Sequence, residues 1–191
     1  MTGFFTTALI GLLAMSTAQA AEIEVPVEPT YPTHVVSMTG YNAVVEQTDG
    51  DPHTTASGAY SNPQIIAARS VDLKEELPYG TVIEVVAKAD TSNPNCGIGL
   101  VDEYIGLRVV ADSMHSRKRN QIDLMFINDK VVRAAGKKVN PAVALGICKN
   151  IEIKVVGKVD IKSLPKTQDS LRTAIGWLPK AGEQNLAIKN I

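Results

Sequence analysis

Hydrophobic and polar residues alternate along much of the central chain, and this alternation predicts short β-strands. Successive side chains of a strand point to opposite faces, and β-branched residues favour that conformation. Six segments carry the alternation or a short apolar run bounded by turn formers. They are residues 34–41, 64–72, 77–89, 106–112, 121–128 and 151–161.

Two further segments carry helix signals. Residues 129–138, DKVVRAAGKK, predict a helix that ends at Gly136. Residues 140–150 predict a second helix, with Asn140 as its N-cap and Pro141 at its first position. Six short strands with one or two short helices indicate a mainly β protein built as a barrel.

The N-terminus has the features of an export signal. Residues 4–15 form an apolar core that is too short to span a bilayer comfortably. The small-x-small sequence at residues 18–20 suits a signal peptidase. The alternative is a buried N-terminal helix. We expect residues 1–20 to be a signal peptide, and the mature protein to be periplasmic or extracellular without a stable membrane anchor.

The rest of the chain divides into three parts. Residues 21–33 contain three prolines, which suit an extended linker. A length of 191 residues favours one domain over two, and the predicted strands place that domain at residues 34–160. Residues 161–191 are then a C-terminal tail with one amphipathic stretch.

Composition argues against several classes of partner. Nineteen basic and 20 acidic residues give a net charge of −1, so nothing points to nucleic acid. Aromatic residues make up 5% of the chain, too few for a base-stacking surface. No His or Cys pair has metal-ligand spacing, and the TASG stretch lacks the ending of a phosphate loop. We therefore expect neither metal nor cofactor.

Cys96 and Cys148 are the two cysteines of the chain. In an exported protein such a pair indicates a disulfide, which would contribute roughly 3–4 kcal/mol through loop closure. The alternatives are two buried thiols or a catalytic cysteine. Because no His is placed beside either residue as a base, the disulfide is preferred.

The stretch ADSMHSRKRNQIDL carries the candidate chemistry. Asp123 lies in an apolar strand and shares a face with Met125 and Ile127. Burial of a lone carboxylate is costly, and desolvation raises its pKa toward values that suit a general acid. Asp112 ends the preceding strand, so both carboxylates would face one cleft if the two strands lie side by side. The alternative is a structural ion pair with Arg117.

Three blocks of the sequence together resemble the 3D domain family, which is named for three aspartates. The first, SMTGYNAVVEQTDGDPHTTASGAYSNP, has a Tyr-containing strand and a TASG loop. The second is VDLKEELPYGTVIEV, and the third, VVADSMHSRKRNQIDLMF, spaces two aspartates as that family does. The resemblance covers about residues 34–160. It implies a six-stranded double-psi β-barrel, related to the barrel of membrane-bound lytic transglycosylase A.

In catalytic members of that family, a strand aspartate cleaves peptidoglycan and leaves a 1,6-anhydro sugar. The resemblance places this acid/base on Asp123, and Asp112 and Asp72 would supply its polar surroundings. Thr55 and Ser57 of the TASG loop would line the cleft.

Two other residues are candidates for substrate binding. Tyr41 could stack on a sugar ring, although tyrosines are equally common at barrel rims. Arg117 in the SRKR run could contact anionic groups of the wall, and a solvated loop is the alternative.

The chain departs from the catalytic members after the second aspartate. Those members continue with Thr-Gly and small residues, which let a glycan approach the backbone. Here Ser113, Met114 and His115 follow Asp112. Three hypotheses therefore remain: a glycan-cleaving enzyme, a barrel that binds peptidoglycan without cutting it, and a structural barrel whose aspartates only tie loops together.

Overall fold

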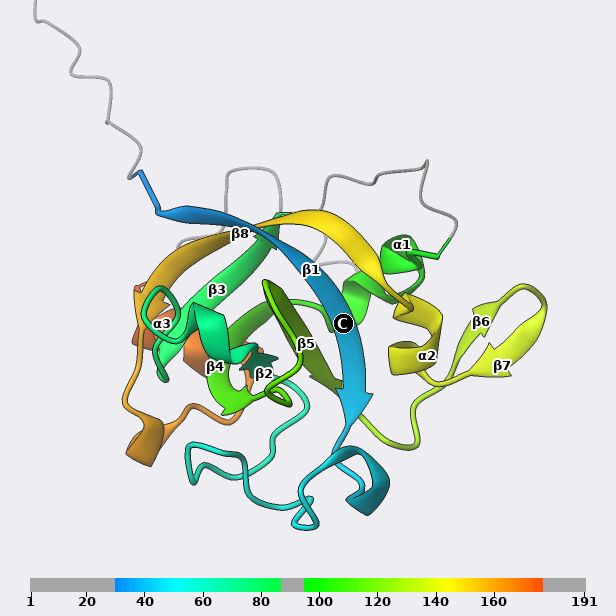
Figure 1. The fold of residues 1–191 in the computed structure, drawn as a ribbon, viewed down its shortest axis with the longest axis horizontal. Coiled ribbons are helices and arrows are strands. Elements are labelled where there is room, and N and C mark those ends of the chain that lie inside the picture. The colour runs from blue at the N-terminus through cyan, green and yellow to red at the C-terminus, as the bar shows by residue number, and fades with distance from the viewer. Residues whose placement is uncertain (1–29, 87–94, 177–191) are drawn as a thin grey trace, which may run out of the picture. The chain divides into compact units, whose positions relative to one another are not determined.

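The computed structural model describes residues 30–86 and 95–176, which form a mainly β protein around one closed barrel (Figure 1). The six barrel strands are β1 (Thr33–Asn42), β2 (Ile66–Arg69), β3 (Thr81–Val86), β4 (Leu107–Ser113), β5 (Gln121–Phe126) and β8 (Cys148–Lys158). This confirms the predicted six-stranded β-barrel. The predicted signal peptide and almost all of the linker lie outside the described residues.

The strand order around the barrel is β1-β5-β2-β4-β3-β8. Strand β5 runs parallel to β1 and antiparallel to β2, and β4 runs parallel to β2 and antiparallel to β3. Twice, therefore, a later strand is inserted between two earlier ones, which is the doubled crossover of a double-psi barrel. Long β8 closes the barrel by pairing with both β1 and β3.

Alternation along the strands divides the buried side chains between two hydrophobic clusters. On β5, Ile122, Leu124 and Phe126 belong to one cluster and Met125 belongs to the other. This is the division of faces that the sequence predicted. Asp123 occupies the same face as Met125, and it is half-buried.

The short elements connect the strands and cover the barrel. The α-helices are α1 (Ile98–Val101), α2 (Pro141–Leu145) and α3 (Gln168–Ala174), and the 3-10 helices are η1 (Val45–Gln47), η2 (Val71–Leu73), η3 (Asp102–Tyr104) and η4 (Ile161–Ser163). The Asn140 side chain accepts a hydrogen bond from the Ala142 amide at 2.8 Å, as expected of the predicted N-cap. In the tail, Leu171 of α3 is fully buried.

The helix predicted at residues 129–138 is wrong. This segment forms a hairpin of β6 (Val132–Ala134) and β7 (Lys137–Val139), which projects from the barrel beside α2 (Figure 1). Ala135 and Gly136 form its turn, with φ angles of 47° and 78°. A turn with positive φ at both central residues matches the twist of paired strands, so Gly136 makes a hairpin turn instead of ending a helix.

Two devices hold distant segments of the chain together. Cys96 and Cys148 form the predicted disulfide, with their Cα atoms 4.6 Å apart. The fully buried Arg108 donates hydrogen bonds to five backbone carbonyls, those of Pro63, Ile66, Tyr104, Ile105 and Met125. Burial lowers the pKa of Arg108 to about 10, so it remains cationic at neutral pH.

Candidate functional site

Two carboxylates meet on the barrel because four neighbouring strands bring one residue each into a single row. Thr39 of β1 pairs with Asp123 of β5, and Asp123 pairs with Ala68 of β2. Ala68 in turn pairs with Asp112 of β4. Paired residues of adjacent strands project from the same face of a sheet. In the row Thr39-Asp123-Ala68-Asp112, the two aspartates therefore lie on opposite sides of the Ala68 methyl group.

A register shift completes this row. Ala67 pairs with Val110, but the next residue, Ala68, pairs with Asp112 and skips Ala111. Such an irregularity re-aims a side chain and is common beside functional sites. Asp112 and Asp123 line the same cavity, but their strands are not side by side as that expectation required, because β2 lies between β4 and β5.

Asp112 is held by three hydrogen-bond donors. Tyr41 Oη donates to Asp112 Oδ2 at 2.7 Å, and the amides of Ala56 and Ser113 donate to Oδ1 at 2.9 and 2.8 Å. Both oxygens of the carboxylate thus accept hydrogen bonds, which fix its orientation. Burial and the neighbouring Asp112 charge raise the pKa of Tyr41 well above its usual range, so Tyr41 stays a donor.

Asp123 has a different environment. Thr39 Oγ1 donates to Asp123 Oδ1 at 2.8 Å, and Gln121 Nε2 donates to the same Thr39 oxygen at 2.8 Å. Because the amide occupies an acceptor site of that hydroxyl, the Thr39 proton is directed at Asp123. No ion pair involves Asp123 within the described part of the chain.

The pKa of Asp123 is raised to about 6. Burial is the largest cause, and the charge of Asp112 adds to it, while the Thr39 hydrogen bond and the Lys118 ammonium oppose it. The two carboxylates thus differ in their surroundings: three donors hold Asp112, whereas Asp123 can carry a proton close to neutral pH. Such a division is typical of acid/base sites.

The cavity in front of these carboxylates has a volume of about 460 Å³. The segment after β1 contributes acidic Glu46 and Asp49 to its lining, and the segment after β4 contributes His115 and Lys118. Its other lining residues are Tyr41, Gln47, Thr48, Thr54, Ala56, Ser61, Ala68, Asp112, Ser113, Met114 and Asp123. A ligand in this space would meet the Asp123 carboxyl beside charged groups of both signs.

The third aspartate of the motif lies elsewhere. Asp72 belongs to η2 and does not line the cavity. Its Oδ2 accepts the Asn120 amide at 2.9 Å. Burial is the largest single influence on its pKa and raises it, but hydrogen bonds from the Ser70 side chain and the Asn120 backbone, with smaller contributions, lower the pKa overall. Asp72 therefore anchors the end of the segment that carries Lys118.

Of the remaining predicted binding residues, Tyr41 lines the cavity, whereas Thr55, Ser57 and Arg117 do not. Tyr41 contributes the hydroxyl that donates a hydrogen bond to Asp112. Thr55 is buried and makes hydrogen bonds to Ser57 Oγ at 3.0 Å and to the Ala59 carbonyl at 3.2 Å, so these two residues shape the loop. Arg117 is exposed and does not line the cavity.

Sequence reasoning missed Thr39, Gln121 and Lys118. Strand alternation carried a signal for two of them, since Thr39 lies two residues before Tyr41 and Gln121 lies two residues before Asp123. Lys118 had no signal of this kind, because the sequence does not say which member of the SRKR run turns toward the cavity.

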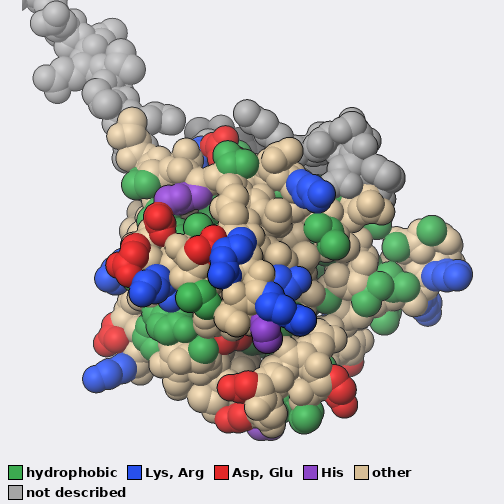
Figure 2. Space-filling model, viewed as in Figure 1, with side chains coloured by type: hydrophobic (Ala, Val, Ile, Leu, Met, Phe, Trp, Pro, Cys, Tyr) green, Lys and Arg blue, Asp and Glu red, His purple; other side chains and the backbone are tan. Residues whose placement is uncertain are grey.

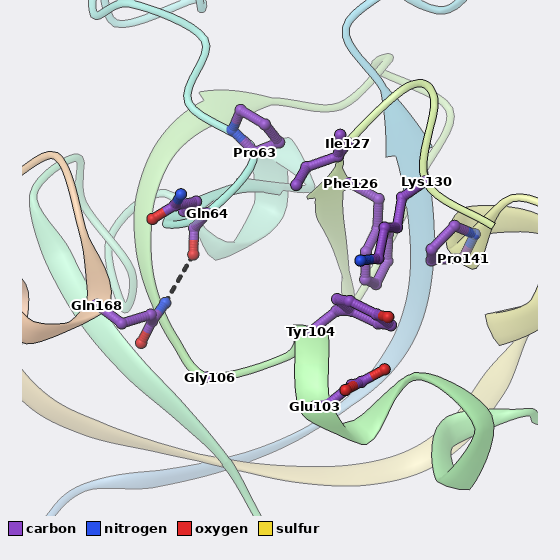
Figure 3. A pocket seen from close by; sticks show the side chains of 10 residues that line it. All are labelled: Pro63, Gln64, Glu103, Tyr104, Gly106, Phe126, Ile127, Lys130, Pro141 and Gln168. Atoms are coloured by element: carbon purple, nitrogen blue, oxygen red, sulfur yellow. Dashed lines mark hydrogen bonds between the residues drawn. The ribbon is translucent and has the colours of Figure 1, made fainter. Parts of the chain in front are cut away.

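A second, smaller cavity of about 250 Å³ lies between the start of α3, η3 and the end of β5 (Figure 3). Its walls are mostly apolar, with Phe126, Ile127 and the ring of Tyr104. The Gln168 amide at its edge is already used by Gln64 O at 2.6 Å and by the Leu107 backbone at 2.8 and 2.9 Å. This cavity contains no carboxylate pair like that of the larger one.

Within residues 30–86 and 95–176, no group of three His, Cys, Asp or Glu side chains is arranged to hold a metal ion. None of the helices in the same ranges is long and apolar enough to cross a membrane. Comparison of the chain with family models and with curated proteins gave no match in either case.

Proposed function

We propose that this protein is an exported enzyme that cleaves the glycan strands of peptidoglycan in the manner of a lytic transglycosylase. The observation that carries the proposal is the pair Asp112 and Asp123 at one cavity, with the pKa of Asp123 raised to about 6. The three sequence blocks that resemble the 3D domain family, and the double-psi connectivity on which they lie, support the same assignment.

In the proposed reaction Asp123 acts first as the acid. It gives its proton to the glycosidic oxygen, and the bond from that oxygen to C1 of the muramoyl sugar breaks. The carboxylate of Asp123 then takes the proton of the muramoyl 6-hydroxyl while that oxygen attacks C1, which restores the acid and leaves the 1,6-anhydro ring. No water is consumed, so no second carboxylate has to activate one.

Asp112 is the second carboxylate of the site. Its three donors fix its position, and in the proposed reaction its charge offsets the positive charge that develops at C1. It also disfavours ionisation of Asp123, which supports the protonated acid. With a pKa of about 6, roughly half of the molecules carry the proton at pH 6 and about a tenth carry it at pH 7.

A binding module is the alternative, and one observation favours it. Met114 and His115 line the cavity at the positions where catalytic members of the resembled family have small residues. Bulk at these positions keeps a glycan farther from the backbone. A barrel of this kind would hold peptidoglycan at the same cavity without bringing a glycosidic oxygen to Asp123.

The experiment is product analysis after incubation with peptidoglycan sacculi. The protein without residues 1–20 is compared with Asp123→Asn and with Asp129→Asn, a change at an exposed carboxylate outside the cavity. We expect anhydro-muropeptides in the mass spectra of the wild type and of Asp129→Asn, and none from Asp123→Asn. If no variant releases them but all sediment with sacculi, the binding module replaces the enzyme. If Asp123→Asn cleaves as fast as the wild type, the assignment of Asp123 is wrong.

A further inference from the structure

The segment from residue 130 to residue 151 has an unusual charge. It contains five basic residues, Lys130, Arg133, Lys137, Lys138 and Lys149, and no Asp or Glu, in a chain whose net charge is −1. Three of these, Arg133, Lys137 and Lys138, lie on the projecting hairpin β6–β7 (Figure 1). Within the described residues none of these three takes part in an ion pair.

Exposed aliphatic side chains lie next to this hairpin. Leu100 of α1, Val143 of α2 and Ile147 are 47%, 69% and 53% exposed. All three line one open groove together with Ala134 and Ala135 of the hairpin. Lys137 pairs with Ala134 and so projects from the same side of the hairpin as this groove residue, whereas the pair of Arg133 and Lys138 projects from the other side. We call these five residues with Lys137 the hairpin face. Figure 2 shows basic side chains at the tip of the hairpin and hydrophobic ones along it.

Basic residues beside protruding aliphatic ones are the combination that binds membrane surfaces. Each Lys or Arg near an anionic leaflet strengthens binding about fivefold, and inserted aliphatic groups add the free energy of leaving water. A soluble polyanion would use the charges but would leave Val143 and Ile147 in water. We propose that the hairpin face docks the barrel on a bilayer that contains anionic lipid.

This proposal does not depend on the chemistry at Asp123. The hairpin face shares no lining residue with the carboxylate cavity. A docked barrel therefore keeps that cavity available, and loss of docking is expected to leave cleavage of isolated sacculi unchanged. Binding at this face is reversible and peripheral, in contrast to a spanning helix.

The test is co-sedimentation with lipid vesicles at neutral pH and low salt. The protein without residues 1–20 is used, because the apolar core at residues 4–15 would itself bind lipid; every described element lies within residues 30–176. We expect binding to vesicles of phosphatidylglycerol and phosphatidylcholine, little binding to phosphatidylcholine alone, and weaker binding at high salt.

Matched variants locate the contact. Lys137→Gln is expected to weaken binding about fivefold, from one basic contact. Lys166→Gln makes the same charge change outside the hairpin face and is expected to have little effect. Val143→Ser with Ile147→Ser is expected to weaken binding by about tenfold.

Three outcomes overturn the proposal. The first is failure of the wild type to sediment with the anionic vesicles. The second is an equal loss of binding in the two lysine variants, which would make the attraction nonspecific. The third is binding of soluble polyglutamate as tight as that of vesicles, with no effect of the serine changes, which would make the face a polyanion site.

Discussion

Asp112 and Asp123 are cross-strand neighbours of the same residue, Ala68, although they belong to different strands of the barrel. The methyl group of Ala68 is the smallest side chain that a strand offers besides glycine. The space beside it belongs to the cavity that both carboxylates line. Asp112 can thus act on Asp123 through its charge without a direct hydrogen bond between them.

Removal of the Asp112 charge is expected to make Asp123 a stronger acid. In Asp112→Asn the pKa of Asp123 falls below about 6, because a neighbouring negative charge no longer disfavours ionisation. If the enzyme proposal holds, the alkaline limb of its pH–rate profile moves to lower pH. A pH titration of the Asp123 carboxyl by carbon NMR measures the shift, with Asp129→Asn as control. An unchanged or higher pKa would contradict the coupling.

Lys118 is expected to have the opposite effect. Its ammonium favours the ionised form of Asp123, so Lys118→Met raises the pKa of Asp123. Arg117→Met is the matched control, because Arg117 belongs to the same run but does not line the cavity. The same NMR titration distinguishes the two variants. Equal shifts in both would mean that the whole basic run acts on Asp123, instead of the one side chain at the cavity.

Burial of Asp123 is expected to reduce stability at neutral pH. The pKa of this carboxyl is about 6 in the folded protein and 3.8 as its ordinary value. The native state therefore binds the proton more tightly, and stability falls as pH rises from about 4 to about 6. Asp123→Asn should remove this penalty. Its free energy of unfolding should exceed that of the wild type by about 1–2 kcal/mol above pH 6, with no difference below pH 4. Urea denaturation at several pH values measures the difference, and a gain independent of pH would contradict this account.

Opening the Cys96–Cys148 bond is expected to destabilise the barrel. The two cysteines are 52 residues apart in sequence, and a loop of that size corresponds to about 3–4 kcal/mol in the chain-entropy account. Cys96→Ala with Cys148→Ala should lose about that amount in urea denaturation, and the reduced wild type should lose a similar amount. A loss below about 1 kcal/mol would mean that residual structure already restricts the reduced, unfolded chain.

Close packing of α1 against α2 is expected to exclude any side chain at Gly97. A Cβ built there would lie 1.9 Å from the Ala144 carbonyl oxygen, whereas one at Gly99 meets nothing within 4 Å. Gly97→Ala should lower the midpoint of thermal unfolding by several degrees. Gly99→Ala, which replaces glycine within a short helix, should be neutral or slightly stabilising. Similar midpoints for the two variants would show that the helices move apart at little cost.

Local pattern was enough to predict the strands, the disulfide and the face of Asp123. These features depend on near neighbours in the chain: alternation decides which side of β5 Asp123 occupies, and two cysteines have one possible partner each. The hairpin at residues 132–139 was missed because its glycine is equally typical of a helix end. The choice between the two depends on whether Val132 and Val139 face each other, which the tertiary structure decides.

The site itself was decided by tertiary structure. Asp112 and Asp123 come together because β2, a strand from much earlier in the chain, is inserted between β4 and β5 with a one-residue register shift. In the folded barrel Asp72 does not line the cavity, and Lys118 lines it whereas Arg117 does not. The sequence by itself determined the local conformation and the chemistry of each side chain, since these follow from short-range sterics and polarity. Only the tertiary structure decided which of them meet, because pairing between distant strands depends on the packing of the whole barrel.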